Sequence, residues 1–376
     1  MKMKWVFFAV LAMFFALAVN LWARAVNTTD IDQVLKKTVL DEEDFKVIDD
    51  FLSAAIQELV RTRDFTSIAQ QRAVIVSKKS AQGQYAQRFS ESAHRHIQAG
   101  FQQVQELRPE ERRTNVVINL LILIDSLQDL RLADLAMPWL KDQNMVVRYW
   151  AVHSLTNAAA VQQLNSGAPS SPTLANTVVD RLKEAVETSS PEILVQIARF
   201  AASVNVPQGE GLLLQVADVR IKRYAEWTVK YEFYDVGILK LLESKLPLPS
   251  AGSGSIGSAT GPGKPAIAQR FAQLYSYAIQ RYIKGSERAL LNEVQKRHLV
   301  SVLVEVEEKC IGRLLNRPQV TIRRAIERES MTALLDEHNR LLGAETTAGE
   351  LPSQLGFDYG SNRTAPIPLP DPPKKP

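Results

Sequence analysis

The chain of 376 residues contains a single cysteine, Cys310. One thiol cannot form an internal disulfide, so the fold has to be stabilised by the burial of apolar side chains. Unpaired cysteines are usually small buried apolar residues, and we expect the same of Cys310. A reactive thiol would need an exposed, electropositive setting instead.

The chain also lacks an excess of charge of one sign. Its formal net charge is +4, but three of its 45 basic residues are Lys2, Lys4 and Arg24, in a first segment without acids. The remainder has 42 basic and 41 acidic residues. A nearly neutral chain lacks the electrostatic footprint of a nucleic-acid binder. We therefore expect no nucleic acid among its partners.

Catalytic signatures are absent from the sequence. There are five histidines, and none lies in a pattern with a nucleophile and an acid. The stretch 252–257 matches G-x-G-x-x-G by letter, but no buried strand precedes it and no helix pattern follows. Glu91 and His94 have the Glu-x-x-His spacing of helical di-metal sites, but no second copy exists. We predict no catalytic residue, no cofactor and no metal site.

The N-terminus has the features of a secretory signal. Lys2 and Lys4 are followed by an apolar run, Trp5 to Leu21, and then by Ala23-Arg24-Ala25, a small-x-small cleavage pattern. We predict that residues 1–25 are a signal peptide and that the mature protein is periplasmic or extracellular. The alternative is an uncleaved membrane anchor, because about 17 apolar residues lie at the short edge of a bilayer span.

The remaining apolar residues repeat with a helical period, and alternating runs typical of strands are almost missing. Residues 45–60 carry apolar side chains at helical spacing, and Val116–Ile124 is almost wholly apolar, as in a buried helix. The predicted class is all-α. Seven prolines lie between residues 343 and 376, where helical periodicity is lost and extended polyproline conformation is favoured.

These changes in composition predict six segments. They are a signal peptide (1–25), an N-terminal helical region (26–108), a helical stack (109–246), a Gly/Ser/Pro linker or loop (247–266), a C-terminal helical unit (267–342) and a disordered proline-rich tail (343–376).

One predicted helix has a recognisable pattern of residues. Asp142 is followed by Val147-Arg148, then by Ala151 and Leu155. A small alanine allows a neighbouring helix to approach, valine and leucine fill a core, and Asp142 and Arg148 can pair between turns or repeats. This stretch resembles one helix of a HEAT repeat, a member of the armadillo-type helical repeats.

Two weaker copies follow, centred on Ala198 and Ala225. The first lies 47 residues after Ala151, at the upper end of roughly 40–47 residues for such repeats, and the second only 27 residues further on. The resemblance implies a short superhelical stack that binds other proteins. The alternative is an irregular helical domain with one similar segment.

Four aromatic residues near the end of the predicted stack recur at intervals of three or four residues, which is helical spacing. Tyr224, Trp227, Tyr231 and Tyr234 would form a single stripe if the chain were helical there. Aromatic residues are common anchors of protein interfaces, so this is the candidate protein-binding surface. The alternative is a core stripe covered by another helix.

Together these features predict an exported, noncatalytic interaction or scaffold protein of the cell envelope, with an unidentified protein partner. Two alternatives stay open. One is an enzyme whose active site forms only in three dimensions, and the other is an adaptor tethered to the membrane by a retained N-terminal segment.

Overall fold

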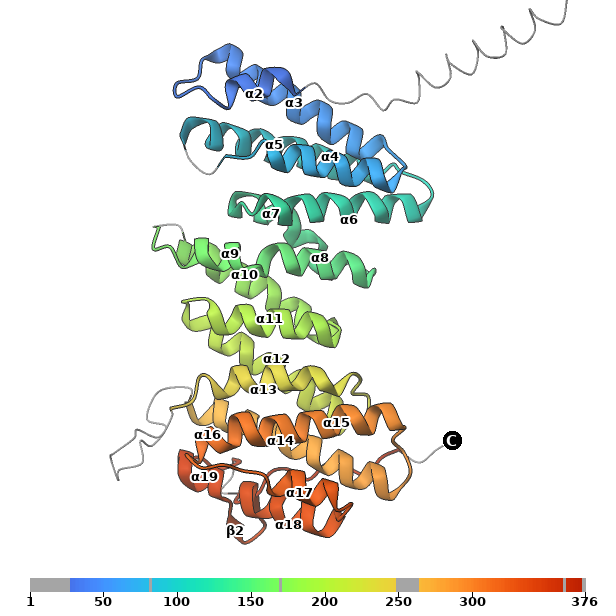
Figure 1. Cartoon of the computed structure of the whole chain (residues 1–376), viewed down its shortest axis with the longest axis vertical. Helices are drawn as coiled ribbons and strands as arrows, with labels where there is room; N and C mark the ends of the chain where they lie inside the picture. Colours follow the sequence, from blue (N-terminus) through green and yellow to red (C-terminus); the bar gives the residue numbers. More distant parts are fainter. Residues whose placement is uncertain (1–27, 81–82, 169–170, 248–263, 361–362, 374–376) are drawn as a thin grey trace, which may run out of the picture. The chain divides into compact units, whose positions relative to one another are not determined.

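The structure, a computed structural model, describes residues 28–80, 83–168, 171–247, 264–360 and 363–373. Within these ranges the chain is all-α, as predicted, and the only sheet is a two-stranded hairpin. The chain divides into two compact units, unit 1 ending at Trp139 and unit 2 beginning at Leu140. Figure 1 labels the helices of both units.

The predicted signal peptide lies outside the described residues. Of the helices that the structure describes, none combines the length and the apolar character needed to cross a bilayer.

Unit 1 consists of antiparallel helices connected by short turns. Its elements are α2 (Thr29–Val34), α3 (Glu42–Arg61), α4 (Phe65–Ser77), α5 (Gly83–Val104), α6 (Glu110–Leu127), the 3-10 helix η1 (Leu130–Leu132) and α7 (Ala133–Ala136). A second 3-10 helix, η2 (Met137–Lys141), spans the boundary between the units.

The helices of unit 1 pack in two layers, with α3 on α5 in one and α4 on α6 in the other. The predicted apolar face of α3 is confirmed, since Ile48, Leu52 and Leu59 are fully buried. The acidic first turn of α3 forms a capping box, in which the Asp41 side chain accepts from the Asp44 backbone N–H.

Unit 2 contains the remaining elements. They are α8 (Met145–Thr156), α9 (Ala158–Leu164), α10 (Ser171–Ala185), η3 (Val186–Thr188), α11 (Pro191–Ser203), α12 (Pro207–Ala225), η4 (Glu232–Tyr234), α13 (Asp235–Glu243), α14 (Lys264–Glu287), α15 (Glu293–Val306), the π-helical turn η5 (Glu307–Ile311), α16 (Gly312–Leu314), α17 (Thr321–Glu327), α18 (Met331–Leu342), β1 (Gly343–Ala344), β2 (Thr347–Ala348) and α19 (Glu350–Leu355).

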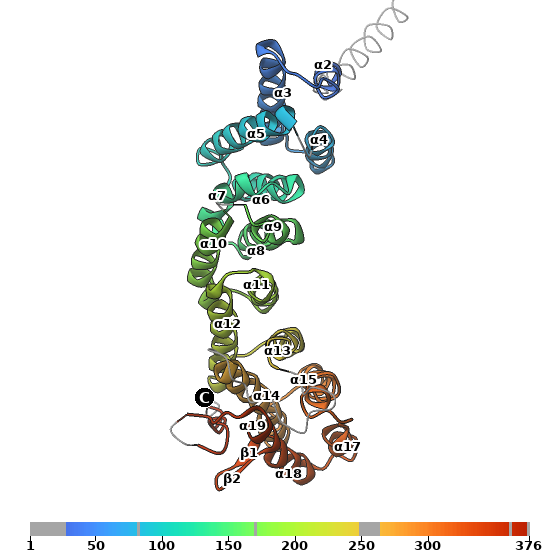
Figure 2. The same ribbon diagram turned by 90° about the vertical axis from the view of Figure 1, so that its left-hand side faces the viewer.

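Unit 2 is also a two-layer stack. Helices α8, α11, α13 and α15 pack in sequence as one layer, while α10, α12, α14 and α18 form the other. Figure 2 shows α8, α11 and α13 along one side of this unit and α10 and α12 along the other. The inner helix α11 buries Ile193, Leu194 and Ile197 completely, in keeping with its nearly continuous apolar sequence.

The unit boundary lies inside the predicted 109–246 stack, because α6 belongs to unit 1. Most of the predicted linker, residues 248–263, lies outside the described residues, and its last residues, from Lys264, already belong to α14. Because α13 and α14 pack directly against each other within unit 2, the two helices that this segment joins belong to one stack.

The prediction of a disordered tail is wrong for residues 343–360 and 363–373. Leu351 and Leu369 in this stretch are 0% and 1% exposed, and α19 packs on α14 and α18. Gly343 has φ +111°, and a Cβ there would lie 2.1 Å from the backbone oxygen of Thr364. Only glycine allows the two segments to approach so closely. Prolines therefore exclude neither packing nor, at Pro352 in the first turn of α19, a helix.

Candidate functional site

The residues of the HEAT-like pattern lie in or next to α8. Val147, Ala151 and Leu155 are buried, at 2%, 0% and 0% exposure. The Arg148 guanidinium donates to the backbone oxygen of Asp142 at 2.6 Å, whereas the Asp142 carboxylate accepts from the Asn144 backbone N–H. The Asp–Arg pair therefore closes the turn before α8 through the backbone of Asp142.

The predicted aromatic stripe is not the face of one helix. Helix α12 ends at Ala225, and both Trp227 and Tyr231 have positive φ angles, +58° and +52°. Left-handed backbone at a residue other than glycine ends helical geometry. Tyr224 is fully buried, Tyr231 is 55% exposed, and Trp227 and Tyr234 are half-buried. The four rings therefore occupy different environments.

Tyr224 belongs to a buried polar cluster that sequence reasoning missed. The Arg220 guanidinium donates from Nε and Nη2 to the two carboxylate oxygens of Asp235, at 2.6 and 2.9 Å, and both side chains are 0% exposed. The Tyr224 hydroxyl donates to the same carboxylate at 2.8 Å. Burial, and then the Asp235 charge, raise the pKa of Tyr224 well above its usual value, so it stays a neutral donor.

The buried cluster also fixes the loop between α12 and η4. Arg220 donates from Nη1 and Nη2 to the backbone oxygen of Lys230, at 3.4 and 3.3 Å. Left-handed geometry at a non-glycine residue costs roughly 1–2 kcal/mol. Arg220 therefore helps to hold the strained conformation in which Tyr231 extends away from the core.

Aromatic rings, two of them exposed, gather around η4 in unit 2. The Phe233 ring centroid lies 6.4 Å from that of Tyr231, 4.3 Å from Tyr234 and 4.8 Å from His298 on α15. Phe233 is 38% exposed. Beneath these rings, the buried Glu232 carboxylate lies 3.3 Å from Arg281 Nε and 3.8 Å from His298 Nδ1.

A second group of rings lies on α8. Tyr149 contacts Trp150 and His153, with ring centroids 5.5 and 5.9 Å apart. Helix α11 packs against α8 and against η4, and η4 packs against α15, so the elements that carry the two groups of rings follow one another in one layer. We name the combined set the aromatic surface: Tyr149, Trp150, His153, Tyr231, Phe233, Tyr234 and His298.

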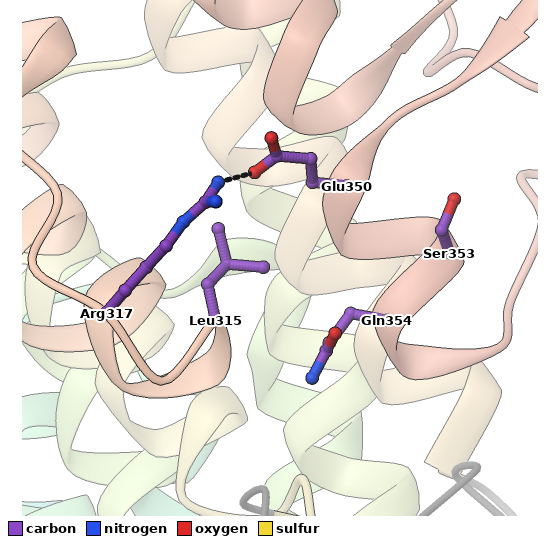
Figure 3. A pocket seen from close by; sticks show the side chains of 5 residues that line it. All are labelled: Leu315, Arg317, Glu350, Ser353 and Gln354. Atoms are coloured by element: carbon purple, nitrogen blue, oxygen red, sulfur yellow. Dashed lines mark hydrogen bonds and ion pairs between the residues drawn. The ribbon is translucent and has the colours of Figure 1, made fainter. Parts of the chain in front are cut away.

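A pocket of about 360 Å³ lies elsewhere in unit 2 (Figure 3). Arg317 and Glu350 point toward each other across it and form an ion pair, and Ser353 and Gln354 line it from α19. The Ser353 hydroxyl donates to the Gly349 backbone oxygen at 2.8 Å, within the first turn of its own helix. Arg317, Glu350 and Ser353 are thus already engaged in bonds within the fold.

Unit 1 contains a serine, an aspartate and a histidine in contact, but not as a catalytic triad. The Ser92 hydroxyl and His96 Nε2 both bond to the same oxygen of Asp49, at 2.6 and 2.8 Å, and Arg95 joins them at 2.7 Å. In a triad the histidine lies between the serine and the acid. This cluster instead ties α5 to α3.

Cys310 is fully buried, as expected. Burial raises the pKa of its thiol to about 12, so the thiolate is not accessible near neutral pH. In the ranges that the structure describes, no three His, Cys, Asp or Glu side chains converge as a metal site would require.

Comparisons with known proteins return no match: no family model, no curated protein and no solved structure is similar to the chain at a significant level.

Proposed function

We propose that this protein is an exported, noncatalytic interaction or scaffold protein of the cell envelope, and that it binds a protein partner on the aromatic surface of unit 2. The observation that carries the proposal is the exposure of Tyr231 and Phe233, at 55% and 38%, in a group of rings that also contains Tyr234 and His298. Buried aromatic residues usually form a core, so rings left at the surface are typical of an interface.

The support beneath the rings favours binding. Rigid anchors bind tightly because little conformational entropy is lost when the partner arrives. The bidentate Arg220–Asp235 pair and the Arg220–Lys230 bonds hold the loop before Tyr231 in one conformation. Aromatic residues on such a fixed loop contribute most to interfaces when a partner covers them completely.

We further propose that the helical stack is of the HEAT type. The supporting observations are the two layers of alternately packed helices and the burial of Val147, Ala151 and Leu155 in α8. Repeats of this kind present a long surface made of equivalent helices. In unit 2 the aromatic surface runs across such a layer, from α8 past α11 to η4 and α15.

Export is proposed from the sequence of residues 1–25. N-terminal sequencing of the protein isolated from its cells tests this directly. A mature chain that begins at Val26 supports a free exported protein, and a chain that retains residues 1–25 contradicts it in favour of the tethered adaptor.

The binding proposal is tested by affinity capture from envelope extracts. The full chain is compared with Y231S/F233S and with the control V39S/L335S, which also removes two exposed apolar side chains. Loss of two interface anchors costs at least about 2 kcal/mol each, so capture of the partner should fall more than tenfold. The control should capture as the wild type does. An identical set of proteins captured by all three would contradict the proposal.

A further inference from the structure

The proline-rich segment 363–373, which we call the strap, lies along one face of α14 and is bound there by side chains rather than by a sheet edge. Gln273 accepts from the Ile367 backbone N–H at 2.8 Å and donates to the Ile367 backbone oxygen at 3.0 Å. Two turns further along α14, the Gln280 side chain accepts from the Leu369 backbone N–H at 2.7 Å. Both glutamines thus recognise the extended backbone itself.

The last turn of α14 and the residue after the helix supply positive charge. Lys284 donates to the Leu369 backbone oxygen at 2.5 Å and pairs with the Asp371 carboxylate at 3.2 Å. Arg288 pairs with the same carboxylate at 3.2 Å. Residues 367, 369 and 371 of the strap therefore contact successive positions along α14 and the residue after it. The acidic side chain at position 371 neutralises both Lys284 and Arg288.

An aromatic ring completes the site. The Trp227 indole N–H donates to the backbone oxygen of Pro370 at 2.9 Å, and the Arg281 guanidinium lies 5.1 Å from the Trp227 ring centroid. A tryptophan that donates to a carbonyl of an extended proline-rich segment is a general means of recognising polyproline conformation. This contact gives Trp227 a role separate from the aromatic surface.

The strap is held by few buried groups. Pro366 and Leu369 are buried, whereas Ile367 and the Asp371 side chain are 48% and 66% exposed. Among the side chains that bind the strap, Gln273 is buried, whereas Gln280, Lys284 and Trp227 are partly exposed and Arg288 is exposed. Hydrogen bonds and ion pairs of partly exposed side chains contribute little net stability, because water can replace them. Proline-rich segments lose little entropy on binding, because their extended conformation is already populated when free. Such a segment can be exchanged for another with the same pattern.

We propose that the face of α14 formed by Gln273, Gln280 and Lys284, together with Arg288 directly after the helix and with Trp227, is a binding site for an extended proline-rich peptide of the pattern Pro-x-Pro-Leu-Pro-Asp. The strap is the resident ligand of this site, and a segment of a second protein with the same chemistry displaces it. The acidic residue of the ligand matches the two cations. The two residues between the prolines supply the backbone N–H groups from which Gln273 and Gln280 accept, and the carbonyl of the proline before the aspartate accepts from Trp227. This site is independent of the aromatic surface.

The experiment uses the full chain with the substitution Leu369→Asp, which places a charge where the strap buries an apolar side chain and so releases it. The probe is a fluorescein-labelled peptide with the sequence of residues 363–373, and binding is followed by anisotropy. The wild-type chain should bind the peptide at least tenfold more weakly than L369D, because its own strap competes at a high effective concentration. If both chains bind the peptide equally, or if folded L369D does not bind it, the proposal is overturned.

Matched variants show which groups recognise the peptide. In the L369D chain, Q273A/Q280A should reduce peptide binding at least tenfold, whereas Y231S/F233S should leave it unchanged. The Y231S/F233S pair distinguishes this site from the aromatic surface, because only the proposed function depends on Tyr231 and Phe233. A peptide with lysine in place of the aspartate should bind at least tenfold more weakly, because it faces two cations. Unchanged binding in both tests would show non-specific adsorption and overturn the proposal.

A second route covers the case in which L369D does not fold. Asp371→Lys alters only an exposed side chain and places a third cation beside Lys284 and Arg288, so it too should release the strap and restore peptide binding. Light scattering then identifies the source of the ligand. A wild-type chain that is a dimer, and becomes a monomer with D371K, would show that straps are exchanged between copies and would overturn the assignment to a second protein.

Discussion

Each unit contains a cluster of paired ionised side chains, and the two clusters differ in burial. In unit 1 the cluster around Asp49 lies at the surface, with Asp49 34% and Arg95 57% exposed. In unit 2 the Arg220–Asp235 pair is 0% exposed, and Glu232 and Arg281 are 1% and 4% exposed. Surface pairs are solvated in any conformation, whereas a buried pair is stable only in the geometry that satisfies it. The buried pairs of unit 2 therefore specify the corner that displays Tyr231 and Phe233.

The largest expected effect on this difference between the units is that of the substitution Asp235→Asn. The substitution leaves the buried Arg220 guanidinium without its counter-charge, and removing one partner of a buried pair costs about 3–5 kcal/mol. Hydrogen exchange followed by mass spectrometry should show lost protection in α12 and α13, with unit 1 unchanged. Protection that stays at the wild-type level in α12 would contradict the importance of this pair.

The matched control is the triple variant R220M/Y224F/D235L, which replaces the whole cluster by apolar side chains of similar size. Since no buried charge is left unpaired, it should regain most of the protection that D235N loses. If the cluster serves to shape the loop, the triple variant should nevertheless capture less partner than the wild type, because the Lys230 carbonyl loses its donor.

A smaller effect is expected from Tyr224→Phe. This variant removes one hydrogen bond to the Asp235 carboxylate, while Arg220 still donates to both of its oxygens. Hydrogen bonds to charged groups contribute about 1.5–3 kcal/mol. Local exchange in α12 and α13 should therefore fall between that of the wild type and that of D235N. A loss as large as in D235N would place the main contribution in the hydroxyl.

A weaker effect is expected from Asp49→Asn in unit 1. Exposed pairs contribute about 0.2–1 kcal/mol, so protection in α3 and α5 should change only slightly. A loss in α3 comparable with that of D235N in α12 would show that the two units do not differ in the way proposed.

The pH dependence of the Asp49 cluster should be the smallest effect. Burial alone would raise the pKa of Asp49, but hydrogen bonds from Ser92 and His96 outweigh it and hold the pKa below its usual value. The unfolded chain, with an ordinary pKa of about 3.9, therefore binds this proton more readily. The stabilisation is present above about pH 4 and is lost as the pH falls through the folded-state pKa. The difference in melting temperature between wild type and D49N should thus shrink from pH 7 to pH 3, and a difference that grows would reverse the assignment.

Helical periodicity in the sequence was sufficient to predict the fold class and much of the core. The buried faces of α3 and α11, the positions Val147, Ala151 and Leu155, and Cys310 all lie where their spacing or residue type indicated. Helix α5 was harder to interpret, because its abundant Gln and Ser residues mask the buried positions Phe89, Ile97 and Phe101. Its apolar spacing was nevertheless present in the sequence.

The candidate site could not be predicted in the same way. The positive φ angles at Trp227 and Tyr231 occur beside two tertiary hydrogen bonds, from Arg220 to the Lys230 carbonyl and from the Trp227 indole to the Pro370 carbonyl, which no local propensity reveals. The strap was missed because prolines indicate only an extended backbone, while the side chains that bind it lie about ninety residues earlier, on α14. Contacts of this kind combine sequence positions that no periodic pattern connects.

The burial of Cys310 has a practical consequence. Because this thiol is protonated and inaccessible in the folded chain, maleimide reagents should leave the native protein unmodified. A cysteine introduced at position 231 or 367 would then be the single labelled site, so fluorescent probes could report separately on the loop before η4 and on the segment along α14 without altering any other residue.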